Sequence, residues 1–201
     1  MARDRRARPQ AESLRLFVAV DMPEEVGIAL EEAVRPWRER LDGGRWVPRD
    51  NWHVTLKFLG RTYPRLVAMV QSVCGEVAAE VAPFQVRVSG LGVFPGPGRA
   101  RVLWAGLDDR EGRLVELAAA LDSRLAKEFT PEKRAFTPHL TVARFNPPVT
   151  MREHAEALAA AEIGAPEFVV DRLVLYRSHL SPRGARYEAL EGFPLGAPSG
   201  R

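Results

Sequence analysis

Cysteine is almost absent from this sequence: Cys74 is the only one in 201 residues. One thiol cannot form an intramolecular disulfide, and its isolation excludes a metal cluster held by several cysteines. Cys74 lies among valines and alanines in a helical-looking segment, so we interpret it as a small buried hydrophobe rather than a catalytic thiol. The scarcity of cysteine is typical of a reducing compartment, and we expect the protein to be cytoplasmic.

Long apolar runs and a strong excess of one charge are also absent. No stretch reaches the roughly 20 apolar residues that a membrane-spanning helix needs. The 29 basic and 26 acidic side chains leave a net charge of +3, which is compatible with a small phosphate ligand and is only weak evidence for a polyanionic partner. Residues 1–12 are arginine-rich and lack the hydrophobic region of a secretory signal, so we expect a disordered basic tail there.

One motif, His-x-Thr, occurs twice in apolar segments. It reads His53-Val54-Thr55 in the first segment and His139-Leu140-Thr141 in the second, 139 − 53 = 86 residues later. In a β-strand, side chains alternate between the two faces, so each His would share a face with its Thr. The spacing suggests one unit used twice, with both copies meeting at a shared site.

The expected secondary structure repeats in the same way. We expect strands at 14–20, 45–48, 53–60, 84–94, 100–107, 138–145, 168–176 and 185–190, and helices at 24–41, 64–82, 110–128 and 150–161. Within the first helix, Pro36 predicts a kink or a break. The run Pro97-Gly98-Arg99-Ala100-Arg101 corresponds to Pro182-Arg183-Gly184-Ala185-Arg186, at an offset of 186 − 101 = 85 residues.

These repeats argue for an internal duplication. Helices that alternate with hairpins predict an α+β protein with antiparallel or mixed sheets and helices outside. We therefore expect residues 13–201 to form a single bilobal domain, with two pseudo-two-fold lobes and a central cleft between the two motif strands.

Two histidines facing each other across a ligand suit in-line displacement at phosphorus. Histidine titrates near pH 6.5, so one ring can accept a proton from water while the other donates one to the departing oxygen. Each transfer is worth roughly 10² to 10⁴ in rate. Hydroxyls of Thr55 and Thr141 can donate to the non-bridging oxygens. This scheme needs neither a cofactor nor a metal, and neither strand offers the carboxylate or cysteine that a two-histidine zinc site would require.

Other residues near the motifs carry weaker signals. Lys57 shares strand parity with His53, so it either adds positive charge at the phosphate or is an exposed strand lysine. Simple alternation sends Arg144 to the face opposite His139. His154 is interpreted as solvated, and His179 as a turn residue that could line the cleft.

Each motif also has a purely structural explanation: a half-buried strand in which the His and Thr side chains form hydrogen bonds with nearby groups. One copy alone would favour that alternative. Two copies at equivalent places in a repeat favour a functional site, because packing seldom requires the same polar pair twice.

With its extended motifs the sequence resembles the 2H phosphoesterase superfamily, and in particular the RNA 2′,3′-cyclic phosphodiesterases, also called 2′–5′ RNA ligases. The first signature motif of this family is similar to Arg45-Trp46-Val47-Pro48 with Asn51 and the run 53–60. Its second signature motif is similar to the run 136–144. The resemblance covers nearly the whole chain after the tail.

The resemblance implies hydrolysis of an RNA or nucleotide 2′,3′-cyclic phosphate to a 2′-phosphate without a metal. It implies that His53 and His139 are the acid–base pair and that Thr55 and Thr141 hold the phosphate. Arg144 matches the arginine that closes the second signature, which adds it to the phosphate-binding set.

Two other functions stay open at this point: ATP-independent 2′–5′ RNA ligation at the same site, and binding of RNA ends without turnover. The sequence leaves open which histidine is the acid, which RNA is the substrate, and whether the protein is a monomer, which is the default expectation. Aromatic residues that could stack a base are Trp46, Trp52 and Phe136, although such residues are more often core.

Overall fold

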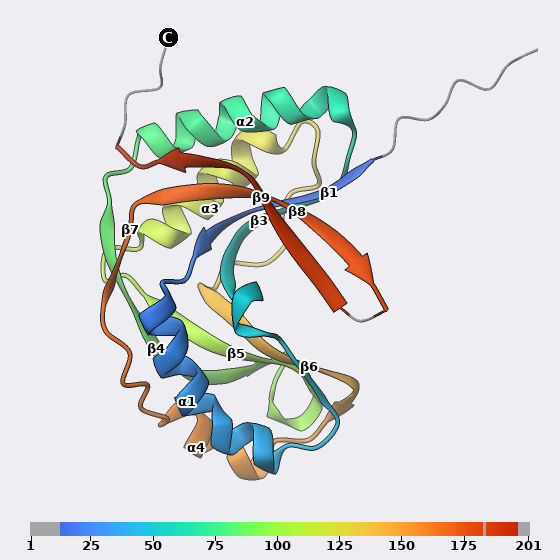
Figure 1. Cartoon of the computed structure of the whole chain (residues 1–201), viewed down its shortest axis with the longest axis vertical. Helices are drawn as coiled ribbons and strands as arrows, with labels where there is room; N and C mark the ends of the chain where they lie inside the picture. Colours follow the sequence, from blue (N-terminus) through green and yellow to red (C-terminus); the bar gives the residue numbers. More distant parts are fainter. Residues whose placement is uncertain (1–12, 183, 197–201) are drawn as a thin grey trace, which may run out of the picture.

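In the computed structural model, which describes residues 13–182 and 184–196, antiparallel strands form one curled sheet with helices on its outer side (Figure 1). The expected basic tail at 1–12 lies outside the described residues. The strands are β1 (Leu14–Asp21), β2 (Gly44–Trp46), β3 (His53–Thr62), β4 (Phe84–Phe94), β5 (Ala100–Asp108), β6 (His139–Val149), β7 (Phe168–Val170), β8 (Arg172–Ser181) and β9 (Gly184–Pro194). The helices are α1 (Glu24–Arg40), α2 (Pro64–Ala79), α3 (Arg113–Leu125) and α4 (Ala155–Ala159), with 3-10 turns η1 (Arg49–Asn51), η2 (Pro97–Arg99) and η3 (Arg152–His154).

The strand order, β7-β4-β5-β6-β3-β1-β8-β9, divides the sheet into two lobes of four strands, and β2 pairs with β6. The lobes are not the two halves of the sequence. Strand β4, from the first half, pairs with β5, while β8, from the second half, pairs with β1. Each half of the sequence thus contributes a strand to the other lobe, so neither half of the sequence forms a lobe by itself.

The lobes join at the middle of the sheet, where β3 meets β6. Among the described residues, Val54 and Leu140 are the one pair in register between these two strands. Both side chains are buried in the core. Since 54 + 86 = 140, this pair lies on the pseudo-two-fold axis that relates the two motifs.

Two pairs of helices cover the outer side of the sheet. Helices α2 and α3 pack on each other and on β3, β8 and β9, whereas α4 packs on β4. Helix α1 lies with α4 at the other end of the molecule (Figure 1), and Trp37 of α1 contacts His154 at the start of α4.

The expected break at Pro36 is not found, because α1 runs on to Arg40. Burial of Val34 and Trp37 on either side of the proline holds the last turn in place. The last helix is shorter than expected, at Ala155–Ala159 in place of 150–161. Leu158 is its one buried residue, so little apolar packing supports a longer helix.

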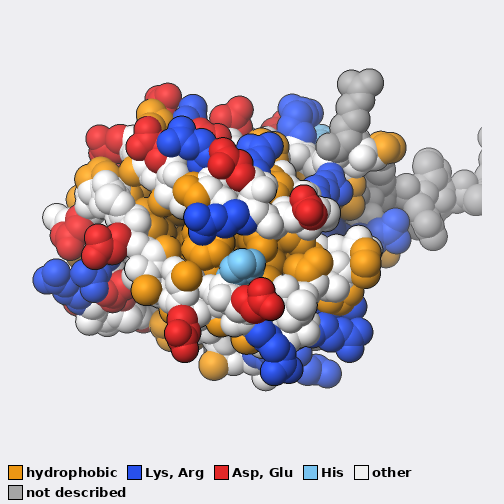
Figure 2. All heavy atoms as spheres, turned by 90° about the horizontal axis from the view of Figure 1, so that it is seen from below, with side chains coloured by type: hydrophobic (Ala, Val, Ile, Leu, Met, Phe, Trp, Pro, Cys, Tyr) orange, Lys and Arg blue, Asp and Glu red, His pale blue; other side chains and the backbone are white. Residues whose placement is uncertain are grey.

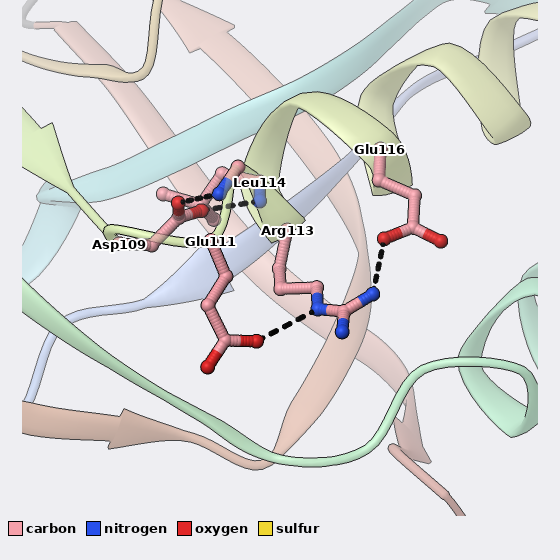
Figure 3. A network of polar contacts seen from close by, with 6 residues as sticks. Asp109, Glu111, Arg113, Leu114 and Glu116 are labelled. Carbon is pink, nitrogen blue, oxygen red and sulfur yellow. Dashed lines mark hydrogen bonds and ion pairs between the residues drawn. The ribbon is translucent and has the colours of Figure 1, made fainter.

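The start of α3 is set by a carboxylate, and it falls at Arg113 rather than at the expected residue 110. Asp109 accepts hydrogen bonds from the backbone N–H groups of Gly112 and Leu114, each at 2.5 Å (Figure 3). Gly112 has a φ of 74°, which delays the helix until these N–H groups are capped. Arg113 bonds to both Glu111 and Glu116 on the surface beside this cap (Figure 3).

Burial elsewhere agrees with the interpretation of the cysteine. Cys74 is fully buried in α2, and burial raises the pKa of its thiol to about 12.

At the end of the molecule formed by α1 and α4, apolar side chains gather in a hollow with basic and acidic side chains around it (Figure 2). None of the helices in the described ranges has the length and apolar character to cross a membrane.

Candidate active site

The two motif strands have the same pattern of burial, residue for residue. From each His onward, the first seven positions of β3 and β6 read half-buried, buried, half-buried, buried, buried, exposed, buried. Two consecutive buried residues break the simple alternation of a strand, which indicates a β-bulge. The two motif strands therefore share a local backbone irregularity as well as the motif.

In β3 the bulge falls at Leu56, because Thr55 pairs with Ala19 while Lys57 pairs with the next residue back, Val18. In β6 it falls at Val142, which is skipped between the pairs that Thr141 and Ala143 form with β5. Each bulge exchanges the faces of the residues that follow it, as far as the next shift in register.

The bulge in β6 corrects the expectation for Arg144. Alternation sends its side chain away from His139, but the extra residue returns it to the same face. After burial, which is the main cause, its positive charge also lowers the pKa of both His53 and His139. The structure thus brings Arg144 together with the two motifs.

The bulge in β3 moves Lys57 out of the site, so the expectation that it shares a face with His53 is wrong. Its side chain is buried on the outer side of the sheet. There its ammonium pairs with Asp122 of α3 and donates to the carbonyl of Thr130 at 2.9 Å. Together with its hydrogen bond from the Glu132 N–H, this pair holds the pKa of Asp122 below its usual value although burial raises it.

The register between the strands sets each His against the other motif. Continued from the pair Val54–Leu140, antiparallel pairing sets His53 across from Thr141 and Thr55 across from His139. All four side chains are half-buried on the inner face of the sheet. Neither threonine hydroxyl bonds to another group of the described residues, so both can donate to a ligand.

One ring nitrogen of each His is used by the backbone. Nδ1 of His53 lies 2.8 Å from the carbonyl oxygen of Asn51, and Nδ1 of His139 lies 2.7 Å from that of Thr137. A carbonyl only accepts, so Nδ1 carries the proton in both rings. Nε2 is left to exchange a proton with a ligand, in the same way in both halves of the site.

Aromatic rings hold both imidazoles in place. Phe17 stacks on His53 at 4.7 Å between ring centroids, and Tyr187 meets it edge-on at 5.0 Å. In the other lobe, Phe94 meets His139 edge-on at 5.0 Å and Trp104 lies at 6.4 Å. Such packing leaves each ring little rotational freedom, which favours a defined direction for Nε2.

Burial among these rings disfavours the charged imidazolium. It lowers the pKa of His53 to about 4, against the raising effects of the Asn51 carbonyl and the Asp21 carboxylate. It also lowers the pKa of His139, against the raising effect of the Thr137 carbonyl. Without a ligand both rings are therefore neutral at pH 7, and an anion between them would favour protonation.

Two positions break the symmetry of the site. Asp21 lies in register with His53 and accepts a hydrogen bond from the Tyr176 hydroxyl. The matching partner of His139 is Gly106, which has no side chain to supply a charge. At the second position, Phe58 occupies in β3 the place that Arg144 occupies in β6, since 58 + 86 = 144.

The other suggested residues have contacts of their own. His154 packs edge-on against Trp37, and His179 bonds to Glu188 at 2.7 Å. Trp52 is buried and donates to the Val47 carbonyl, which makes it a core residue. Trp46 and Phe136 are partly buried against the core.

Sequence reasoning missed the rings around the imidazoles and the role of Asp21. Phe17 belongs to the apolar run 14–20 and Asp21 directly follows it, which is typical of an ordinary strand and its end. Their importance comes from pairing with a strand more than 30 residues away.

Within the described residues, His, Cys, Asp and Glu side chains form no cluster of three or more that could hold a metal ion.

Comparison with known proteins gives a consistent picture. A family model described as the 2′–5′ RNA ligase superfamily matches residues 26–182. The RNA 2′,3′-cyclic phosphodiesterase of Thermus thermophilus is 36% identical over 197 residues, which cover 94% of this chain and 93% of the relative. The protein of the same name from Geobacillus stearothermophilus is 32% identical over 194 residues and 92% of this chain, but this chain spans only 59% of its length.

The fold has a matching solved structure as well. The crystal structure of TT0787 of Thermus thermophilus has a TM-score of 0.73 against this chain at 32% identity. The match covers 91% of this chain and 98% of that one. The similarity therefore extends through both lobes and includes both motif strands.

Proposed function

The chain belongs to the 2′–5′ RNA ligase superfamily, and on that basis we propose that it hydrolyses the 2′,3′-cyclic phosphate at the 3′ end of RNA to a 2′-phosphate. The observation that carries this proposal is the arrangement of the two histidines. Both are held by a backbone carbonyl at Nδ1, and both therefore present Nε2. Two relatives that cover most of this chain are named for the same activity.

The reaction divides between the two rings. One neutral Nε2 accepts a proton from water as its oxygen forms a bond to phosphorus. The bond between phosphorus and the 3′ oxygen breaks, and the other ring, as imidazolium, donates a proton to that oxygen. The phosphate remains on the 2′ oxygen. Each proton transfer contributes roughly 10² to 10⁴ in rate.

The Asp21 carboxylate favours His53 as the acid and His139 as the base. Its charge favours the imidazolium of His53, and Gly106 offers no equivalent to His139. The cyclic phosphate adds its own negative charge when it binds, which raises the pKa of the nearby rings. Asp21 thus offsets part of the burial that lowers the pKa of His53 to about 4, and it gives the His53 imidazolium a stabilising charge that the His139 imidazolium lacks.

Thr55, Thr141 and Arg144 complete the site. The hydroxyls donate to the non-bridging oxygens, where negative charge grows during the reaction. Arg144 supplies a positive charge and a planar fork of donors that matches a phosphate. We propose that this set of protein groups replaces a metal ion.

Ligation is the second candidate, because the family model is described by it. A 5′ hydroxyl in place of water would attack the same phosphorus and expel the same 3′ oxygen, which forms a 2′–5′ bond. The acid and the base keep their roles. Hydrolysis is preferred as the main reaction because water is always present in excess.

The test uses a 2′,3′-cyclic nucleotide and an RNA with the same end, each with and without excess EDTA. We expect a product with the phosphate on the 2′ oxygen and unchanged rates in EDTA. His53→Ala and His139→Ala should each remove the activity without loss of the folded state, which circular dichroism would check. His179→Ala, at a histidine bound to Glu188, is the matched control.

Three results would contradict the proposal. Near-full activity in either single variant would exclude the two-histidine mechanism. Complete loss in EDTA would indicate a metal enzyme. Tight binding of the cyclic phosphate by the wild-type protein, with no product, would indicate a protein that binds RNA ends without turnover.

A further inference from the structure

A second hollow adjoins the site on the β3 side. It has a volume of about 580 Å³ and lies between the end of β3 and the loop that precedes β6. The residues that line it are Phe58, Leu59, Gly60, Thr130, Pro131, Glu132, Lys133 and Arg134. Its size suits a nucleotide-sized ligand, and the scheme proposed above for the reaction does not use it.

Aromatic contacts connect this hollow to the reacting centre. The ring of Phe17 contacts His53 at 4.7 Å and Phe58 at 6.5 Å between centroids. Phe58 therefore lies on the same inner face as the histidines, and 43% of it is exposed. Phe58 lies five residues along β3 from His53, so the hollow lies to one side of the reacting centre.

The hollow carries positive charge. Lys133 and Arg134 are exposed, and neither forms an ion pair with any acidic side chain of the described residues. Arg15 adds a guanidinium 4.7 Å from the centroid of the Phe58 ring. Glu132 is the single acidic residue of the lining. Two lining cations against one lining carboxylate, with the Arg15 guanidinium over the Phe58 ring, fit a polyanion.

Two hydrogen bonds to the loop backbone hold the loop that carries Lys133 and Arg134. Buried Lys57 donates to the Thr130 carbonyl at 2.9 Å, and the Glu132 N–H donates to Asp122 at 3.0 Å. The buried pair of Lys57 and Asp122 thus fixes the wall of the hollow that faces Phe58. These two contacts limit the movement of the loop and so help to preorganise the lining residues.

We propose that this hollow binds the single-stranded RNA that precedes the cyclic phosphate end. This rests on the function proposed above. The phosphodiester groups on the 5′ side of the reacting nucleotide lie along Lys133 and Arg134, with Phe58 at the border toward the reacting end. The substrate is therefore an RNA strand of several nucleotides, and a cyclic mononucleotide uses only part of the binding surface.

The test compares a 2′,3′-cyclic mononucleotide with an oligonucleotide that has the same end, over a range of salt concentrations. For the wild-type protein, we expect a higher kcat/KM on the oligonucleotide. The double variant Lys133→Ala/Arg134→Ala should lower that value roughly tenfold and leave the mononucleotide unchanged. The slope of log kcat/KM against log salt should decrease by about 1.4, for two lost phosphate contacts on a single strand.

The matched control is Arg35→Ala/Arg38→Ala, which removes two exposed charges from α1. This helix lies in the lower part of Figure 1, away from the loop before β6. Equal losses on the two substrates, no loss on either, or an equal loss in the control would overturn the inference while the hydrolase activity stands.

A binding measurement separates the two proposals. Anisotropy of a labelled oligonucleotide with a 2′-phosphate end needs no turnover. If the wild-type protein hydrolyses neither substrate but binds this oligonucleotide through Lys133 and Arg134, the hydrolase proposal fails and the RNA site stands. If the double variant binds it as tightly as the wild-type protein does, the RNA site is wrong.

Discussion

Val54 and Leu140 are paired across the centre of the sheet, and the pseudo-two-fold axis passes between them. Both side chains point into the core, so the neighbouring His and Thr residues point to the inner face. One apolar contact therefore positions all four polar side chains of the motifs.

Removal of the Asp21 charge should change the pH profile. Asp21→Asn removes a carboxylate that favours the imidazolium of His53, so the pKa of that ring falls. If His53 is the acid, the alkaline limb of the kcat/KM profile on a cyclic mononucleotide should move to lower pH. Asp42→Asn, at an exposed turn residue, is the control. An unchanged alkaline limb would remove Asp21 from the mechanism and would leave the choice of acid open.

Arg144 should be needed for its geometry as well as its charge. We expect Arg144→Ala to lower kcat/KM by roughly 10² or more, on the scale of a lost donor to a developing oxyanion. Arg144→Lys should recover only part of this loss, because an ammonium lacks the planar fork of a guanidinium. Steady-state kinetics on the cyclic mononucleotide would measure both. Activity of Arg144→Ala within twofold of wild type would show that the side chain does not contact the phosphate.

The buried pair of Lys57 and Asp122 should contribute to stability and not to chemistry. Asp122→Ala leaves the fully buried ammonium of Lys57 without its charge partner, and we expect a loss of about 3–5 kcal/mol in the free energy of unfolding. Lys57→Met should cost less, roughly 1–2 kcal/mol, because Asp122 is partly exposed and keeps the Glu132 N–H.

Urea denaturation at pH 7 would measure both losses. On a cyclic mononucleotide, the Lys57→Met protein should keep the kcat/KM of the wild type. A large loss of kcat/KM in a folded Lys57→Met protein would return this lysine to the phosphate site.

Acid should destabilise the protein through His53. Its pKa is about 4 in the folded state and about 6.5 in the unfolded chain. Between these values the unfolded chain binds more protons, so stability is complete above pH 6.5 and falls as the pH decreases toward 4. The shift corresponds to at most about 3 kcal/mol, and His139 adds to it in the same direction.

Urea denaturation at several pH values between 4 and 7 would test this dependence. His53→Gln should flatten the pH dependence of the free energy of unfolding over that range. His179→Gln should leave it as steep as in the wild-type protein. An equally steep dependence in His53→Gln would mean that other groups control acid stability.

Much of the architecture was predictable from local patterns. The hairpin of β4 and β5 follows from alternation on both sides of Pro95-Gly96-Pro97-Gly98, and it is confirmed. The helical faces follow from apolar spacing, as in α1 with Val26, Leu30, Val34 and Trp37. The motif strands were predicted from the repeat. The pairing of β8 with β1 was not, because pairing between distant strands leaves no mark in the local sequence.

Within the site, alternation gave opposite errors for two residues. It assigned Lys57 to the inner face and Arg144 to the outer face, and both assignments are wrong. The cause is one extra residue between the His and the wrongly assigned side chain in each strand, at Leu56 and at Val142. These residues are apolar like their neighbours, so the sequence offered no sign that the register shifts there. Only the resemblance to a known family pointed to Arg144.

The amino-acid sequence alone determined which residue types were present twice, in what order and at what spacing, and this was enough to predict two histidines and two threonines in one site. The tertiary structure decided the rest. Pairing with β1 and β5 created the bulges, and these selected Arg144 for the site and Lys57 for the core. The same strand pairing also placed Asp21 beside His53 and Gly106 beside His139. Charge acts through space and falls with distance, so the difference between two identical motifs comes from strands that lie far away in the sequence.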